Sequence, residues 1–204
     1  MAAEVKASRE EVALPTPGAP GDEEDPADAN RDSQRSNACI EEDNRMGTRG
    51  ETLAKQFEAK VQEALAVVER LSDVDWKKVT AAEHWPVGVT AHHLANAFEA
   101  VPGVLTAMVS GHPRGGFTRA MLDQGNAQHA QEQAHCTKPE TVALLKKGGA
   151  AAAATIRALT DDQLSKSAPV FTDAPPMTPE QLIQGALIHH VDEHIGSIRQ
   201  TVGH

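Results

Sequence analysis

From Leu53 onward, apolar residues recur every three or four positions along much of this 204-residue chain. That interval places them on one face of an α-helix, whereas a half-buried strand would alternate apolar and polar residues. The first stripe consists of Leu53, Phe57, Val61, Ala64, Val68 and Leu71, and the second of Val87, Ala91, Leu94, Phe98, Val101 and Leu105. Because the sequence has no alternating pattern and no internal repeat, it predicts an all-α fold.

Helix-start signals divide this pattern into four long helices. Pro86 suits the first position of the second helix. The runs Thr137–Glu140 and Thr178–Gln181 read as capping boxes, in which side chains satisfy free backbone N–H groups at a helix start. They open the third and fourth helices. Together with a shorter polar helix over 118–134, the pattern predicts a four-helix bundle domain over about residues 50–202.

Residues 1–46 have a different composition from the rest of the chain. They are rich in Pro, Gly, Ser and acidic residues and lack periodic apolar positions. The first 45 residues hold 12 acidic and 5 basic residues, so they carry −7 of the total charge of −10. Such a segment buries too little apolar surface to offset the entropy lost on ordering, so we expect a disordered acidic tail. The abrupt change at Met46 is also compatible with a natural start there.

The near-neutral charge of the predicted domain argues against nucleic acid and membranes as partners. No Lys/Arg cluster offers a basic surface for a nucleic acid or an anionic lipid. No run approaches the roughly 18 apolar residues of a membrane span, and no secretory signal pattern is present. Cys39 and Cys136 are expected to be free thiols. A cytoplasmic location is therefore expected.

His190 and His194 are the residues with the clearest chemical meaning. Four positions apart on the fourth helix, they share a face with apolar residues such as Ile183. On the second helix, His93 lies at the edge of the apolar stripe, whereas His92 lies on a polar face. His93, His190 and His194 would supply three neutral nitrogens, the ligand set of an open site for Zn²⁺, Ni²⁺, Fe²⁺ or Cu²⁺.

The residues alone leave other interpretations of these histidines open. Histidines on an apolar face are often core residues whose nitrogens find hydrogen-bond partners. The run His190–His194 also matches the H-x-x-E-H signature of inverzincin proteases, but few residues follow it for their downstream carboxylate ligand. An i,i+4 pair cannot occupy the two opposite axial positions of one haem. A di-metal carboxylate bundle requires paired E-x-x-H motifs and more inward acids than this chain offers.

Two segments resemble the DinB-like superfamily. The run Trp85–Ala97 is similar to the family's helix-two motif, in which a Trp precedes the ligand His by eight positions, and that His is His93 here. The run His190–Arg199 is similar to the family's H-x-x-x-H segment. The resemblance covers about residues 50–202. It implies a four-helix bundle of unusual connectivity, a divalent metal held by His93, His190 and His194, and often a homodimer.

The same resemblance implies a range of functions. Members with an assigned activity include S-transferases that use low-molecular-weight thiols such as bacillithiol or mycothiol, and a mycothiol-dependent isomerase. We therefore expect a divalent ion (Zn, Ni or Fe), a small-molecule thiol and an electrophile as partners. A metal-dependent hydrolase and a non-catalytic, metal-stabilised interaction module stay open. From its position beside the ligand pair, Glu193 is a candidate to assist proton transfer, with a solvated carboxylate or one that orients a ligand as the alternative. Asn126 and His129 are expected to line the mouth of the pocket.

Overall fold

The computed structural model describes residues 48–112 and 116–203. Within these ranges the chain forms helices, turns and loops but no β-strand, and two isolated bridges, Val79–Pro86 and Ala168–Met177, close loops. The all-α prediction is therefore confirmed. The predicted acidic tail, residues 1–46, lies outside the described residues, and the predicted domain limits stay a prediction.

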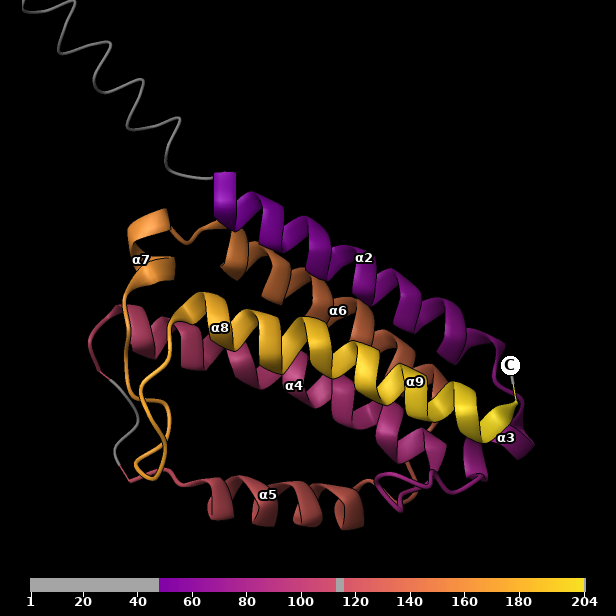
Figure 1. Cartoon of the computed structure of the whole chain (residues 1–204). Coiled ribbons are helices and arrows are strands. Elements are labelled where there is room, and N and C mark those ends of the chain that lie inside the picture. The colour runs from indigo at the N-terminus through magenta and orange to yellow at the C-terminus, as the bar shows by residue number, and fades with distance from the viewer. Residues whose placement is uncertain (1–47, 113–115, 204) are drawn as a thin grey trace, which may run out of the picture. The chain divides into compact units, whose positions relative to one another are not determined.

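Three long helices build most of the core: α2 (Thr48–Arg70), α4 (Val87–Val109) and α6 (Lys138–Arg157). They lie lengthwise beside one another (Figure 1), with their apolar stripes turned inward. Phe57 and Phe98 are fully buried and meet edge to face, with ring centroids 4.9 Å apart. Gly149 of α6 permits close packing on α2, because a Cβ there would lie 2.7 Å from Val61 Cγ1.

The two predicted capping boxes have different outcomes. The Thr178 hydroxyl accepts a hydrogen bond from Gln181 N, and the Gln181 side chain accepts one from Thr178 N, so this box is confirmed. The Thr137 hydroxyl instead donates to the Glu140 carboxylate over 2.6 Å and makes no bond to the helix backbone. The predicted box at Thr137 is therefore wrong, because its two side chains bind each other, although α6 does begin there.

Two short helices fall in segments where the sequence analysis expected only connections. They are α3 (Asp73–Lys77) and α7 (Asp161–Ser165), and each opens with a capping box, from Ser72 and Thr160 respectively. Each cap satisfies backbone N–H groups that would otherwise lack a partner in the first turn. These caps therefore stabilise single turns that are too short to show a hydrophobic period.

The predicted fourth helix is a continuous run of three segments: α8 (Pro179–Ile183), the π-helical η1 (Gln184–His189) and α9 (His190–Val202). In the π segment His190 N donates to Gly185 O, five residues earlier. A π turn advances by a smaller angle per residue than an α turn, so the residues before His190 are rotated from their α-helical positions. The run ends at Gly203, which adopts a left-handed conformation with φ 91°.

Helix α5 (Arg119–Glu132) confirms the predicted polar helix and lies beside α4, on the side away from α2 (Figure 1). Hydrogen bonds attach the start of α5 to the segment that follows α7. Thr172 N donates to Phe117 O over 2.9 Å, and Arg119 N donates to the Asp173 carboxylate over 3.1 and 3.2 Å. These bonds hold α5 over one face of α4, where it covers part of the site described below.

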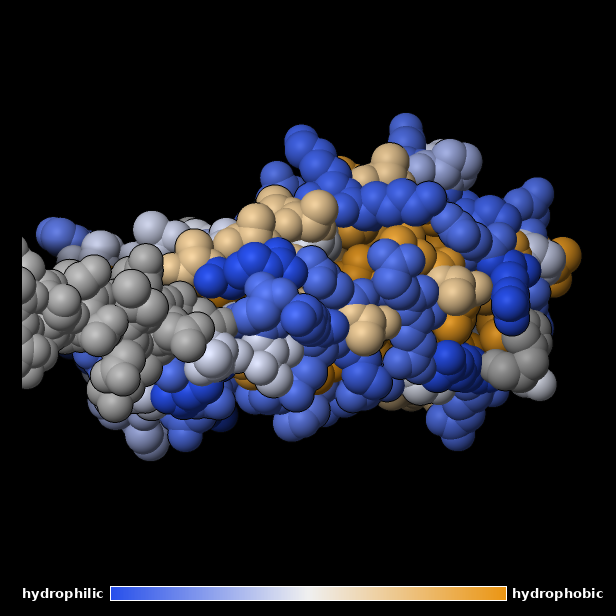
Figure 2. Space-filling model, turned by 90° about the horizontal axis from the view of Figure 1, so that it is seen from above, coloured by the Kyte–Doolittle hydropathy of each residue, from blue (hydrophilic) through white to orange (hydrophobic). Residues whose placement is uncertain are grey.

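Hydrophilic side chains cover most of the face seen in Figure 2, with apolar side chains visible between them. Ion pairs connect the helices at the surface, among them Arg157 with Glu51 and Glu58, at 2.5 and 3.0 Å. Because these side chains are substantially exposed and screened by solvent, such pairs contribute little to stability. Among the described residues, no helix combines the length and apolarity needed to cross a membrane.

Candidate metal centre

Three histidines from two helices meet inside the bundle. His93 lies on α4, and His190 and His194 lie one turn apart on α9. Each offers one nitrogen, and these three nitrogens all lie within 4.8 Å of one another. The ring centroids are 5.0 Å apart for His93 and His190, 5.2 Å for His93 and His194, and 4.4 Å for His190 and His194. The structure thus brings together the residues that the sequence singled out as ligands.

Burial keeps two of these imidazoles neutral at physiological pH. Desolvation, followed by repulsion from the other two histidines, lowers the pKa of His93 to about 3. Desolvation, followed by repulsion from His194, lowers the pKa of His190 to about 4. A neutral imidazole keeps a nitrogen lone pair available, which is the form that binds a metal ion.

One ring nitrogen of His93 has no protein partner among the described residues. His93 is only 6% exposed, and its Nδ1 is buried without a hydrogen bond to any described residue. A buried, unsatisfied nitrogen costs about 1–3 kcal/mol, so native proteins seldom leave one without a ligand, water or ion. The buried nitrogen without a partner therefore supports a metal ion as the ligand of these three histidines.

Glu83 joins the site, and the sequence analysis did not anticipate it. Its carboxylate contacts His194 Nδ1 at 2.7 Å through Oε1 and accepts a hydrogen bond from the Ser197 hydroxyl at 2.6 Å through Oε2. Burial raises the pKa of this carboxyl, but hydrogen bonds from Ser197, Thr80 and His194 outweigh it, so the pKa lies below its ordinary value. An ionised carboxylate only accepts hydrogen bonds, so His194 Nδ1 must donate. In the neutral ring, Nε2 then keeps the lone pair that an ion would bind.

A short loop fixes the position of Glu83. Backbone hydrogen bonds from Val87 N to Lys78 O (2.8 Å) and from Thr80 N to Trp85 O (2.9 Å) close the loop at its base. The same loop places the Trp85 ring against that of His93, with centroids 5.3 Å apart at 68°. The loop therefore orients histidines on both helices, one through an indole ring and one through a carboxylate.

The predicted proton-transfer residue, Glu193, lies on the exposed side of α9. His189, Asp192 and Arg199 are exposed as well, and Asp192 pairs with Lys60 at 2.5 Å. The role of Glu193 in proton transfer therefore stays a prediction. Glu83, by contrast, contacts a cluster histidine directly.

Helix α5 adds a second histidine contact beside the cluster. His92 Nδ1 and His129 Nε2 lie 3.2 Å apart, and both side chains are half-buried. His92 lies on the polar face of α4 as predicted, and α5 partly covers it there. The His129 ring centroid lies 5.8 Å from that of His93. Asn126, one turn earlier, is confirmed as a lining residue of the cavity next to the cluster.

That cavity, of about 260 Å³, opens directly onto two of the three histidines, His93 and His190. Its other walls come from α4, α5, the segment around Phe171 and the C-terminal helical run. A molecule in this cavity would reach the nitrogen cluster without crossing the protein core. The arrangement is that of a site with a ligand chamber, whereas a purely structural metal site is closed by protein.

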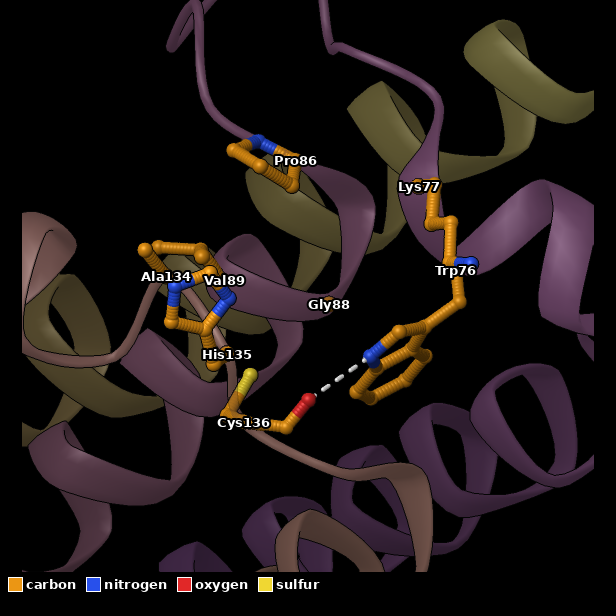
Figure 3. Close-up of a pocket in the computed structure, with 8 residues that line it drawn as sticks. All are labelled: Trp76, Lys77, Pro86, Gly88, Val89, Ala134, His135 and Cys136. Atoms are coloured by element: carbon orange, nitrogen blue, oxygen red, sulfur yellow. Dashed lines mark hydrogen bonds between the residues drawn. The ribbon is translucent and has the colours of Figure 1, made fainter.

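A second cavity, of about 340 Å³, lies apart from the three histidines, between the start of α4 and the connection from α5 to α6 (Figure 3). Trp76 Nε1 donates to Cys136 O across it over 3.0 Å. Gly88 is required there, because a Cβ would overlap the Trp76 indole. Burial raises the pKa of the Cys136 thiol, which is free as predicted. This region joins the helices and contains no cluster histidine.

The distances between the three ligand nitrogens are close to those found around a bound ion. Nitrogens about 2.0–2.1 Å from a tetrahedral ion lie about 3.4 Å apart. From separations of at most 4.8 Å, the three imidazoles would have to approach one another by no more than about 1.4 Å. Three protein ligands leave the remaining positions of such an ion to water or substrate.

Comparison with known proteins agrees with this geometry. No curated protein matches the chain. A family model described as the DinB superfamily matches residues 40–198, which is most of the chain and includes all three histidines and Glu83. The resemblance seen in the sequence is therefore confirmed, and the chain belongs to the DinB superfamily.

Proposed function

We propose that this chain binds one divalent metal ion through His93, His190 and His194 and acts as an S-transferase that joins a low-molecular-weight thiol to an electrophile. The observation that carries the proposal is the buried His93 Nδ1 without a partner, in a cluster where burial keeps the imidazoles of His93 and His190 neutral. Membership of the DinB superfamily supports the thiol chemistry, and the adjacent cavity supports access for a substrate.

The ion would act as a Lewis acid that lowers the pKa of a thiol, so that the thiolate is available near neutral pH. In the transfer, a bond forms between sulfur and the electrophilic carbon, and the bond from that carbon to its leaving group breaks. The leaving group departs with the electron pair, and the thiol proton passes to water. Glu83 holds the His194 ring through its Nδ1–H, and the Trp85 ring packs edge-on against His93.

Elemental analysis and a transfer assay on the purified full chain test this proposal. After loading with Zn²⁺, Ni²⁺ or Fe²⁺ and dialysis, we expect about one ion per chain. The loaded chain should then speed the reaction of a panel of low-molecular-weight thiols with monochlorobimane, an uncharged electrophile. A chain that retains no ion overturns the proposal. A chain that holds the ion but accelerates no thiol reaction overturns the transferase part and favours a hydrolase or an interaction module.

Glu83→Gln is expected to weaken metal binding about 10- to 100-fold, the usual cost of losing a carboxylate that orients a ligand histidine. The amide cannot supply the negative charge that fixes His194 with its proton on Nδ1. Isothermal titration of the metal-free chain with Zn²⁺ measures the change.

Glu193→Gln serves as the matched comparison, since Glu193 is an exposed carboxylate on the helix that carries His194. It should bind Zn²⁺ as tightly as the unaltered chain. If Glu193 assists proton transfer as the sequence predicts, this variant keeps its metal and loses turnover. Equal affinities of the Glu83→Gln variant and the unaltered chain would show that the Glu83 contact does not orient the ligand.

The homodimer and the cytoplasmic location also stay predictions. We expect light scattering of the purified full chain to give a dimer mass, and a fluorescent fusion to distribute through the cytoplasm. A monomeric mass at micromolar concentration would contradict the first of these.

A further inference from the structure

The cavity beside the histidine cluster has an unusual lining for a site whose chemistry is polar. Apart from His93 and His190, its polar side chains are the amides of Asn96 and Asn126. The remaining walls are aliphatic or aromatic. No Asp, Glu, Lys or Arg of the described part of the chain lines it. A charged molecule would therefore lose its hydration without gaining a counter-charge from the walls.

The outer wall of the cavity is aromatic and held in place. The rings of Phe117 and Phe171 stack with centroids 5.6 Å apart and planes 21° from parallel. Thr172 N fixes this pair by donating to Phe117 O over 2.9 Å. The Arg119 guanidinium lies 5.9 Å from the centre of the Phe171 ring, but Arg119 is exposed and does not line the cavity. The stacked pair offers a flat apolar surface suited to a ring.

The volume limits the size of the occupant. An engineered apolar cavity of about 150 Å³ binds benzene, so a cavity of about 260 Å³ has room for one or two rings. Thiols that carry sugars, as bacillithiol and mycothiol do, are larger and more polar than this lining accommodates. The electrophile is therefore the better match for this chamber.

We propose that the cavity binds the electrophilic co-substrate and selects it for being uncharged, mainly apolar and no larger than about two rings. This inference rests on the proposed function, because it assigns one of the two substrates of that reaction to a named chamber. The amides of Asn96 and Asn126 can bind one polar group of the substrate while its apolar part fills the space between Val101, Val104 and Leu182.

Two naphthalene probes of nearly equal size, one uncharged and one anionic, test the selection. Equilibrium dialysis compares 1-naphthalenemethanol with 1-naphthoate on the full chain freed of metal, so that no carboxylate–metal bond contributes. We expect the uncharged alcohol to bind at least about tenfold more tightly, because a buried carboxylate without a partner is costly. Equal affinity for the carboxylate would overturn the proposal.

Leu122 and Met121 supply a matched pair of variants on α5. Both are exposed in part, at 40% and 50%, but only Leu122 lines the cavity. Leu122→Glu should weaken binding of 1-naphthalenemethanol about tenfold, and Met121→Glu should leave it unchanged. A second lining variant, Ala97→Leu, fills the cavity without adding charge and should also weaken binding. If both lining variants bind the alcohol normally, the probe lies elsewhere and the proposal fails.

A kinetic measurement separates this proposal from the proposed function. In the metal-loaded chain, Leu122→Glu should raise the KM for monochlorobimane about tenfold and leave the KM for the thiol unchanged. Turnover with unchanged KM values would overturn the cavity assignment while the transferase proposal stands. If the chain retains no metal after loading but still binds the alcohol selectively and through Leu122, the cavity assignment stands and the transferase proposal fails.

Discussion

His93→Ala is expected to reduce bound divalent metal from about one ion per chain to almost none after dialysis. His93 is the only one of the three histidines that comes from α4, so its loss leaves an i,i+4 pair on a single helix. Removing a metal ligand weakens metal binding by more than the about 10- to 100-fold that follows removal of a carboxylate that orients a ligand. Elemental analysis of the loaded, dialysed protein measures the effect, and His190→Ala should give the same result.

His189→Ala is the matched control for this prediction. His189 precedes His190 in the chain but is exposed, so its loss should leave metal content unchanged. Circular dichroism shows whether each variant remains helical, which separates loss of the ligand from loss of the fold. A folded His93→Ala chain that retains a full equivalent of metal would exclude the three-histidine site.

The histidine cluster could be predicted from the sequence because its signals are local. His190 and His194 are separated by one α-helical turn, and both belong to α9, so the i,i+4 argument holds in the structure. His93 was separable from His92 because the apolar stripe of α4 places one of them at the core edge, and His93 is buried as expected. Trp85, eight positions before His93, also packs its ring against that of His93.

Glu83 could not be predicted in this way, because its contact spans 111 positions in the chain. It lies in a loop, where neither a helical nor a strand period constrains the direction of a side chain. The π segment before His190 likewise could not be predicted, because no periodic pattern in the sequence marks a wider turn. The short helices α3 and α7 did carry a signal, the Ser72-to-Asp75 and Thr160-to-Gln163 caps.

The metal-free chain is expected to lose stability as the pH falls from about 6.5 towards 4. Desolvation lowers the pKa of His93 to about 3 and that of His190 to about 4 in the folded chain, whereas both titrate near 6.5 when unfolded. Below pH 6.5 the unfolded chain therefore binds more protons than the folded chain. The free energy of unfolding then decreases as the pH decreases. A pH of 5 is about 1.5 units below the unfolded pKa, so each imidazole lowers the free energy of unfolding by about 2 kcal/mol at that pH. The two together remove about 4 kcal/mol, a large part of the about 5–15 kcal/mol that stabilises a typical domain.

Urea unfolding of the metal-free full chain at pH 8, 6.5 and 5 measures this loss. The pH range separates the histidines from the carboxyls as the cause of this loss. Carboxyls with a lowered pKa, such as those of Glu63 and Asp75, reduce stability mainly below about pH 4.5, where unfolded carboxyls take up protons. Burial also lowers the pKa values of His92 and His129, so they contribute with the same sign. The double variant His93→Ala, His190→Ala should therefore lose less than half as much stability between pH 8 and 5 as the unaltered chain. Parallel losses in the two proteins would mean that these imidazoles are not held neutral by burial, and the physical basis of the metal site would fail with them.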